Sequence, residues 1–143
     1  MFTASQSKSR APGALLTVGI VALTLTTAYI HFSLGSLLFL LNAAGYVTAA
    51  VVIVVAAWAP HPFIARFSWL PRVGLIGYTL VTIIGYLVMG PYFTLGFIAK
   101  GVELVLIGLL TVDILRVYGS PAGLLATARG SIFGPASDTS VNA

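Results

Sequence analysis

The chain has 143 residues, of which 59% are hydrophobic and only 7% are charged, and it contains no cysteine. Soluble domains carry about 25% charged residues, and so short a chain cannot hide this much apolar surface from water. The composition therefore predicts a single-domain membrane protein. The absence of cysteine excludes disulfides, thiolate nucleophiles and cysteine-bound metal centres. The net charge of +4 comes from scattered basic residues, so it does not indicate nucleic-acid binding.

Four segments are apolar over the ~20 residues that a helix needs to cross the hydrocarbon layer. Their approximate ranges are 13–32, 36–58, 73–90 and 94–118. Each is predicted to be helical, because backbone groups in lipid must form their hydrogen bonds within the segment. Short connections make consecutive spans antiparallel neighbours, so the fold class predicted is an all-α membrane bundle of four transmembrane helices, up-down-up-down.

The two ends of the chain are predicted to be tails outside this domain. Residues 1–12 are polar and basic and are expected to be disordered. Residues 119–143 are rich in small and polar side chains, and part of this tail is expected to lie on the membrane surface. The apolar side chains in that part are Leu124, Leu125, Ile132 and Phe133, around Arg129.

The basic residues predict the orientation of the chain. Six of the seven lie on one side of a four-span arrangement, and only Lys100 belongs to the other half. The six are Lys8, Arg10, Arg66, Arg72, Arg116 and Arg129. Because positive charges favour the cytoplasmic side, we expect a cell-membrane protein with both termini in the cytoplasm. A cleaved signal peptide is the competing interpretation of the first 30 residues, but the apolar run is long and no clear cleavage site follows it.

Ionisable residues within the spans need an explanation, because they are costly in lipid. Lys100 and Glu103 lie three residues apart, on neighbouring positions of one helix face. The simplest interpretation is an intrahelical ion pair whose lysine extends to the outer surface. The alternative is a polar cluster in the outer half of the bundle, formed by His31, Asn42, Lys100 and Glu103. Such a cluster would bind a polar headgroup, relay a proton, hold a metal ion or hold helices together, and Tyr29, Tyr46 and Tyr92 are candidates to join it.

A second pair, Asp113 and Arg116, lies near the inner end of the fourth span and is predicted to be a surface ion pair. Glycines in three spans predict faces on which helices approach closely, within the chain or in another subunit. They are Gly45, Gly74, Gly77, Gly85, Gly101 and Gly108.

The sequence predicts no catalytic residues, metal ligands or cofactor. The two histidines, His31 and His61, lie a membrane thickness apart, which excludes a haem held by both within one chain. No phosphate-binding glycine loop, paired-carboxylate pattern or serine–histidine–acid set is present.

The segment YIHFSLGSLLFLLNAAGY, from Tyr29 to Tyr46, resembles a pattern found in small four-helix membrane proteins of bacteria and archaea that have no assigned activity. In these proteins an Ile-His pair ends the first helix, and a glycine turn leads to a second helix with a Phe-x-Leu-Asn-x-x-Gly-Tyr-like segment. The matching positions are Ile30, His31, Gly35, Phe39, Leu41, Asn42, Gly45 and Tyr46. The resemblance implies the four-helix fold and no particular function.

Three functions are consistent with the sequence. The favoured one is a non-catalytic accessory or scaffold subunit, which acts in the bilayer as a homo-oligomer or within a larger membrane complex. The alternative is a small transport or ligand-binding protein that uses the outer polar cluster. An intramembrane enzyme acting on lipid or quinone is the third, and no residue pattern beyond the same cluster supports it.

Overall fold

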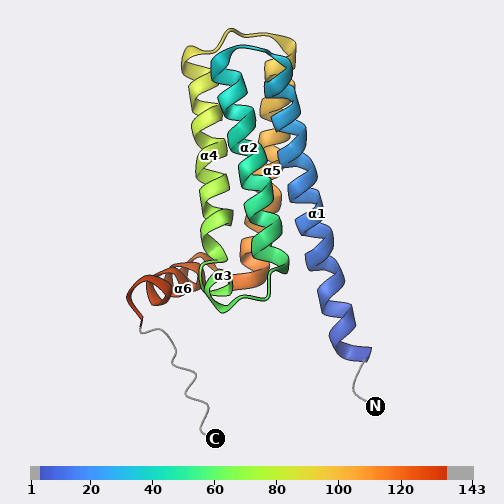
Figure 1. Ribbon diagram of the computed structural model, residues 1–143, viewed down its shortest axis with the longest axis vertical. Helices are drawn as coiled ribbons and strands as arrows, with labels where there is room; N and C mark the ends of the chain where they lie inside the picture. Colours follow the sequence, from blue (N-terminus) through green and yellow to red (C-terminus); the bar gives the residue numbers. More distant parts are fainter. Residues whose placement is uncertain (1–3, 135–143) are drawn as a thin grey trace, which may run out of the picture.

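The computed structural model describes residues 4–134, and the side chains of residues 12–134. Within this range the chain is entirely helical outside its turns (Figure 1). The helices are α1 (Ala4–Ser33), α2 (Leu37–Trp58), α3 (Pro62–Arg66), α4 (Trp69–Met89), α5 (Thr94–Tyr118) and α6 (Pro121–Phe133). Four of them, α1, α2, α4 and α5, are long and apolar enough to span a membrane. The predicted all-α bundle of four spans is thus confirmed.

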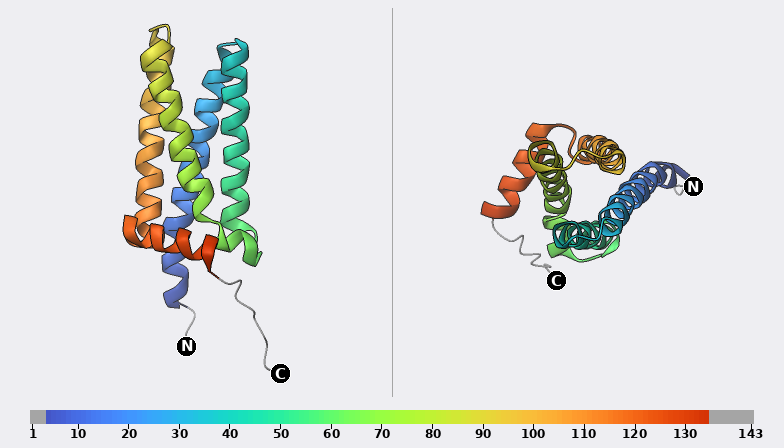
Figure 2. Two further views of the ribbon diagram at one scale, coloured as in Figure 1. Left: turned by 90° about the vertical axis from the view of Figure 1, so that its left-hand side faces the viewer. Right: turned by 90° about the horizontal axis from the view of Figure 1, so that it is seen from above.

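The four long helices run antiparallel to their neighbours in the chain and form a ring in the order α1, α2, α4, α5 (Figure 2). We name the end with the α1–α2 and α4–α5 turns the hairpin end, and the end with α3 and α6 the terminal end. The α1–α2 turn contains Gly35 with a φ of 71°, a conformation that glycine adopts without steric cost. This explains how three residues suffice to reverse the chain.

Two helix starts differ from the predicted boundaries. Residues 1–12 were expected to be a disordered tail, but α1 already begins at Ala4. Ala, Gln, Lys and Arg in this segment have high helix propensity, which favours a helix on the N-terminal side of Pro12 although the proline removes one backbone hydrogen bond. The third span was expected to begin at residue 73, but α4 begins at Trp69 and includes Pro71. Proline is tolerated in the first turn of a helix, where its missing N–H has no partner to lose.

The bundle has an apolar core and an apolar outer surface. Ile20, Tyr46, Leu75, Leu106 and Leu110 are almost fully buried where the helices meet. Large hydrophobic side chains on all four spans are exposed on the outside of the ring. A surface of this kind is stable against lipid and not against water, as expected for a small membrane protein.

The terminal end is more ordered than the sequence predicted. α6 lies across this end, roughly perpendicular to the spans (Figure 2). The Arg66 guanidinium in α3 donates to the carbonyl oxygens of Ser131 and Gly134, both at 2.8 Å, and the Ser131 hydroxyl donates back to the Arg66 carbonyl oxygen at 2.8 Å. Part of the predicted tail 119–143 is therefore a docked helix, and residues 135–143 lie outside the described range.

Candidate functional site

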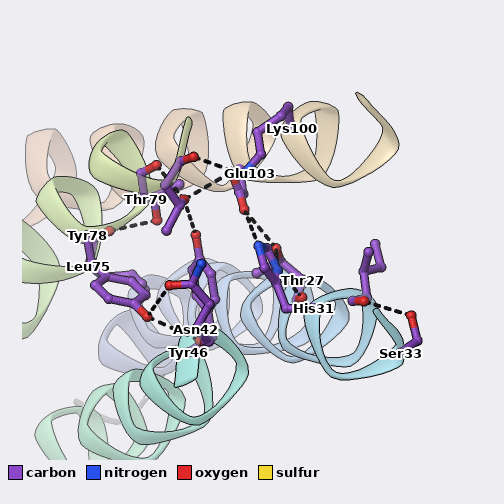
Figure 3. A network of polar contacts seen from close by, with 12 residues as sticks. Thr27, His31, Ser33, Asn42, Tyr46, Leu75, Tyr78, Thr79, Lys100 and Glu103 are labelled. Carbon is purple, nitrogen blue, oxygen red and sulfur yellow. Dashed lines mark hydrogen bonds and ion pairs between the residues drawn. The ribbon is translucent and has the colours of Figure 1, made fainter. Parts of the chain in front are cut away.

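The Glu103 side chain, which is 0% exposed, is the centre of a polar cluster inside the bundle (Figure 3). Its Oε2 accepts a hydrogen bond from Lys100 Nζ at 2.6 Å and lies 3.2 Å from the Thr82 hydroxyl, whose one hydrogen can go to Oε2 or to the Thr79 carbonyl oxygen at 2.8 Å. Its Oε1 accepts one from the Thr27 hydroxyl at 3.1 Å and lies 3.7 Å from His31 Nε2. Side chains of three helices, α1, α4 and α5, thus surround one carboxylate. These contacts compensate a buried negative charge that would be costly if unpaired.

The predicted ion pair between Lys100 and Glu103 is present, but its lysine does not extend to the surface. Lys100 is only 8% exposed. Its Nζ also donates to the Thr82 carbonyl oxygen at 3.3 Å and lies 5.6 Å from the centre of the Tyr86 ring. A carboxylate, a carbonyl and an aromatic face together replace the water that the ammonium would otherwise seek.

The position of the His31 ring defines the roles of its two nitrogens. Nδ1 lies 2.8 Å from the Thr27 carbonyl oxygen, which can only accept, so Nδ1 carries a hydrogen. In the neutral ring Nε2 then carries a lone pair, and it faces Glu103 Oε1. The ring is held between neighbours in α2, with its centre 5.5 Å from that of Tyr46 and 6.0 Å from that of Phe39.

Of the three candidate tyrosines, the structure brings Tyr46 to the cluster. Its hydroxyl lies 2.8 Å from the Thr82 hydroxyl, which in turn can donate to Glu103. Tyr29 and Tyr92 are 72% and 64% exposed and lie apart from Glu103. The cluster therefore draws on α2 through Tyr46, so all four spans contribute to it.

Asn42 belongs to the same region but does not contact Glu103. Its Oδ1 accepts a hydrogen bond from the Tyr78 hydroxyl at 3.1 Å, and its carbonyl oxygen lies 3.2 Å from the same hydroxyl. Because Oδ1 has this partner, the amide NH₂ is the group left for the space beside it. That space is a cavity of about 270 Å³ at the hairpin end of the bundle.

The cavity has a predominantly apolar lining that includes a few polar side chains. Among these are His31, Asn42, Thr82 and Lys100. Most of the other lining residues are apolar, and they come from α2, α4, α5 and the two hairpin turns. Glu103 does not line the cavity, so Lys100 is the only residue in the lining that carries a full charge at neutral pH.

Tyr86 fixes the wall of the cavity beside Lys100. Its hydroxyl accepts from the Phe93 amide at 3.2 Å and lies 3.3 Å from the Phe93 carbonyl oxygen, which ties α4 to the turn before α5. Gly90 and Gly96 leave the room that its ring occupies, since a Cβ on either would collide with the Tyr86 side chain. Neither glycine was among the six predicted to mark packing faces.

Of those six glycines, Gly45 lies against another helix, where a Cβ would collide with the Tyr78 hydroxyl. A Cβ at any of the other five would meet no heavy atom within 4 Å among the described residues. Gly74, Gly77, Gly85, Gly101 and Gly108 therefore do not mark contacts between spans of this chain. Gly85 lines the cavity, whereas Gly74, Gly77, Gly101 and Gly108 are exposed.

The sequence did not point to Thr27, Thr82, Tyr78 or Tyr86, because it was searched for ionisable groups. A helical stripe of hydroxyl residues was the available signal. Thr24, Thr27 and His31 follow one another at three- and four-residue spacing in the first span. Thr79, Thr82 and Tyr86 do the same in the third, and all six residues are buried.

Asp113 forms a second buried cluster, at the terminal end. It was predicted to make a surface ion pair with Arg116, but its side chain is only 2% exposed. Oδ1 accepts from Arg116 Nη2 at 3.0 Å, and Oδ2 accepts from Arg72 Nε at 2.7 Å. The correction arises because α4 begins earlier than predicted, which puts Arg72 on a helix facing α5. Asp113 thus joins α4 to α5.

The described residues include no group of three His, Asp or Glu side chains placed to hold a metal ion. His61 lies at the terminal end, where its Nδ1 accepts a hydrogen bond from the Phe63 amide at 3.2 Å and caps α3. It is therefore a helix-capping residue far from His31.

No family model matches the chain, and no curated protein or solved structure is similar to it. The resemblance of the first hairpin to small prokaryotic four-helix proteins therefore stays a prediction, and the site geometry is the basis for inferring a function.

Proposed function

We propose that this protein binds a small amphiphile in the cavity at the hairpin end of the bundle. One observation carries this proposal: two side chains with N–H groups to donate, Asn42 and Lys100, line a cavity that is otherwise predominantly apolar. Ligand sites are typically apolar pockets with a few polar groups that orient the ligand. A bundle that needed only structural hydrogen bonds between helices would have no reason to keep about 270 Å³ of space beside them.

The size and position of the cavity indicate which molecules fit. An apolar cavity of about 150 Å³ accepts benzene, and drug-sized ligands fill about 300 Å³ or more. Leu38, Val81 and Met89 line the cavity and are also 65%, 68% and 80% exposed on the outside of the bundle. Since this outer surface faces lipid, an acyl chain can pass between α2 and α4 while its head reaches Lys100.

Blocking the cavity tests the proposal. Gly85 lines the cavity and has open space at its Cβ position, so Gly85→Leu would fill the site without a collision at the backbone. Gly77→Leu is the matched control, because Gly77 has the same open space on the same helix but lies outside the cavity. Native mass spectrometry from lipid nanodiscs should find one retained amphiphile on the wild type and on Gly77→Leu. Equal retention by Gly85→Leu would contradict the proposal.

We also propose that the terminal end faces the cytoplasm. Arg66, Arg72, Arg116 and Arg129 belong to this end, whereas Lys100 belongs to the hairpin half. Because the chain has no cysteine, single cysteines report on sidedness without background. In intact cells a membrane-impermeant maleimide should label Ser36→Cys at the hairpin end and leave Ser120→Cys unlabelled until the membrane is opened. The reverse pattern would invert the orientation.

A role as an accessory or scaffold subunit is the second candidate, and the exposed glycines favour it. Gly101 and Gly108 lie seven residues apart on the outer face of α5, where small residues let a neighbouring helix approach closely. This role predicts a homo-oligomer or a stable partner protein in mild detergent. If wild type and Gly101→Leu are both monomers without a bound partner protein in mild detergent, this role is contradicted.

A further inference from the structure

We propose that the cavity selects a single-chain amphiphile with one negative charge on an oxygen-rich head, and that its binding takes up one proton on the His31–Glu103 pair. This inference rests on the proposed function and names the ligand class. It follows from the donors that face the cavity, from the balance of charge around them, and from the free nitrogen of His31.

The groups available to a ligand head are predominantly hydrogen-bond donors. Lys100 Nζ has three N–H groups, of which two go to Glu103 Oε2 and the Thr82 carbonyl oxygen, so one remains. The Asn42 side chain also lines the cavity, and with Oδ1 accepting from Tyr78 its NH₂ is the group left to donate. A head group that only accepts, such as a carboxylate or sulfonate, matches these donors, whereas an ammonium head would meet Lys100 and be repelled.

The charge balance of the empty cluster leaves no spare positive charge for such a head. Lys100 carries +1 and Glu103 carries −1, and with a neutral His31 the cluster is neutral. An anion in the cavity would place two negative charges on one ammonium in a medium where charges are poorly screened. One added proton restores neutrality, so binding of the anion and uptake of a proton favour each other.

The structure provides a place for that proton. His31 Nδ1 is already protonated towards the Thr27 carbonyl oxygen, and Nε2 and Glu103 Oε1 face one another at 3.7 Å as two acceptors. A proton on either atom converts this unfavourable approach into a donor–acceptor pair. Because either atom can hold the proton and the other then accepts from it, we assign the proton to the pair and not to one residue.

Titratable and charged groups face this pair from α5 itself and from α2 and α4, which pack against α1 and α5 respectively. Lys100 comes from α5, and the Tyr46 ring comes from α2 with its centre 5.5 Å from that of His31. From α4, Tyr86 lies beside Lys100, and Tyr78 packs edge-on against Tyr46. Among these, Lys100 is the only cation, so the pair is the group whose protonation compensates a bound anion.

Isothermal titration of the full chain in nanodiscs tests the inference with two dodecyl probes. Dodecanesulfonate stays ionised throughout the pH range used, and dodecanol has the same chain with a neutral head. After subtraction of the Gly85→Leu background, we expect dodecanesulfonate to bind about tenfold more tightly, since charge-assisted hydrogen bonds are roughly twice as strong as neutral ones. Comparing buffers of different ionisation enthalpy should show uptake of about one proton, and affinity should then fall by roughly tenfold per pH unit wherever a full proton is taken up on binding.

Glu103→Gln sharpens the test, because the amide is isosteric, can accept from Lys100 and can donate to His31 Nε2. It removes the negative charge, so dodecanesulfonate should bind at least as tightly as to the wild type and without proton uptake. Unchanged proton uptake in this variant would overturn the assignment to the pair. The wild-type titrations do not depend on the stability of this variant.

The outcomes separate the two proposals. If dodecanol and dodecanesulfonate bind equally and no proton is taken up, the ligand class inferred here is wrong while the cavity remains a binding site. If neither probe binds above the Gly85→Leu background, the proposed function fails as well.

Discussion

His31 Nε2 lies 3.7 Å from Glu103 Oε1, and this contact joins the α1–α2 hairpin to the α4–α5 hairpin. Neither residue is exposed to solvent by more than a few per cent. A carboxylate with this many partners is a structural element of the bundle as well as a candidate site. Replacing Glu103 should therefore change the stability of the bundle as well as its binding of a ligand.

Replacing Glu103 by alanine should destabilise the bundle by about 3–5 kcal/mol, because Lys100 would be left buried without its counter-charge. Glu103→Gln removes the same counter-charge but keeps an acceptor for Lys100 and the filled space, so it should cost less, by about 1–3 kcal/mol, the penalty for leaving buried hydrogen-bonding groups without a partner. The free energy of unfolding in mixed micelles distinguishes the two. Equal losses would show that the charge, and not the filled space and hydrogen bonds, dominates.

The two arginines beside Asp113 should differ in their contribution to stability. A double-mutant cycle between Arg72→Gln and Asp113→Asn should give a coupling energy of about 1–3 kcal/mol, because the contact is buried and joins two helices. The cycle between Arg116→Gln and Asp113→Asn should give less than about 1 kcal/mol, since the Arg116 side chain is 39% exposed and lies on the same helix as Asp113. If the coupling energies were reversed, Asp113 would not be the link between α4 and α5.

Two glycines on α5 should respond in opposite ways to an added methyl group. Gly96→Ala should cost about 1–3 kcal/mol, because the new Cβ would collide with the Tyr86 ring and overpack the turn. Gly101→Ala meets open space and should stabilise the helix by up to about 1 kcal/mol. Thermal unfolding of both variants provides the measurement. A loss of stability in Gly101→Ala that depends on protein concentration would instead indicate an interface between copies.

Arg66→Gln should release α6 from the terminal end. The guanidinium makes two hydrogen bonds to carbonyl oxygens near the end of α6, and hydrogen bonds from charged groups are worth about 1.5–3 kcal/mol each. Amide hydrogen exchange in α6 should therefore accelerate by roughly tenfold or more, while exchange in α5 stays unchanged. Arg129→Gln, on the exposed face of the same helix, is the control and should leave exchange as it is in the wild type.

The number, type and approximate limits of the spans could be predicted because lipid imposes one requirement on the whole chain. A run of apolar residues of membrane length has no alternative to a helix. The Lys100–Glu103 pair was predictable for a similar reason, since spacing along one helix decides which side chains meet. The start of α4 was not, because Pro71 is a helix breaker in most positions and acceptable only in the first turn.

Contacts between helices could not be predicted, since they depend on the rotation of each helix about its axis. Thr27 and Thr82 meet Glu103, and Tyr46 meets Thr82, only because three helices turn these faces inward. The rotation of each helix also decides which glycines contact another helix. Gly45 faces Tyr78, whereas Gly101 and Gly108 face outward. An apolar side chain on a transmembrane helix is stable whether it faces the lipid or the interior of the bundle. The hydrophobic pattern therefore gives little information on which face is buried.

Both acidic residues of α5 have a basic residue three positions away on the same helix, Lys100 for Glu103 and Arg116 for Asp113. The helix therefore carries its own counter-ions when it leaves the ribosome and enters the bilayer. Insertion need not wait for α1 or α4 to neutralise these charges, and each newly inserted α5 is electrically neutral across its length. When the helices then pack together, Glu103 and Asp113 gain partners from other helices, but their charges are already paired. The insertion of α5 therefore does not depend on the order in which the two hairpins meet.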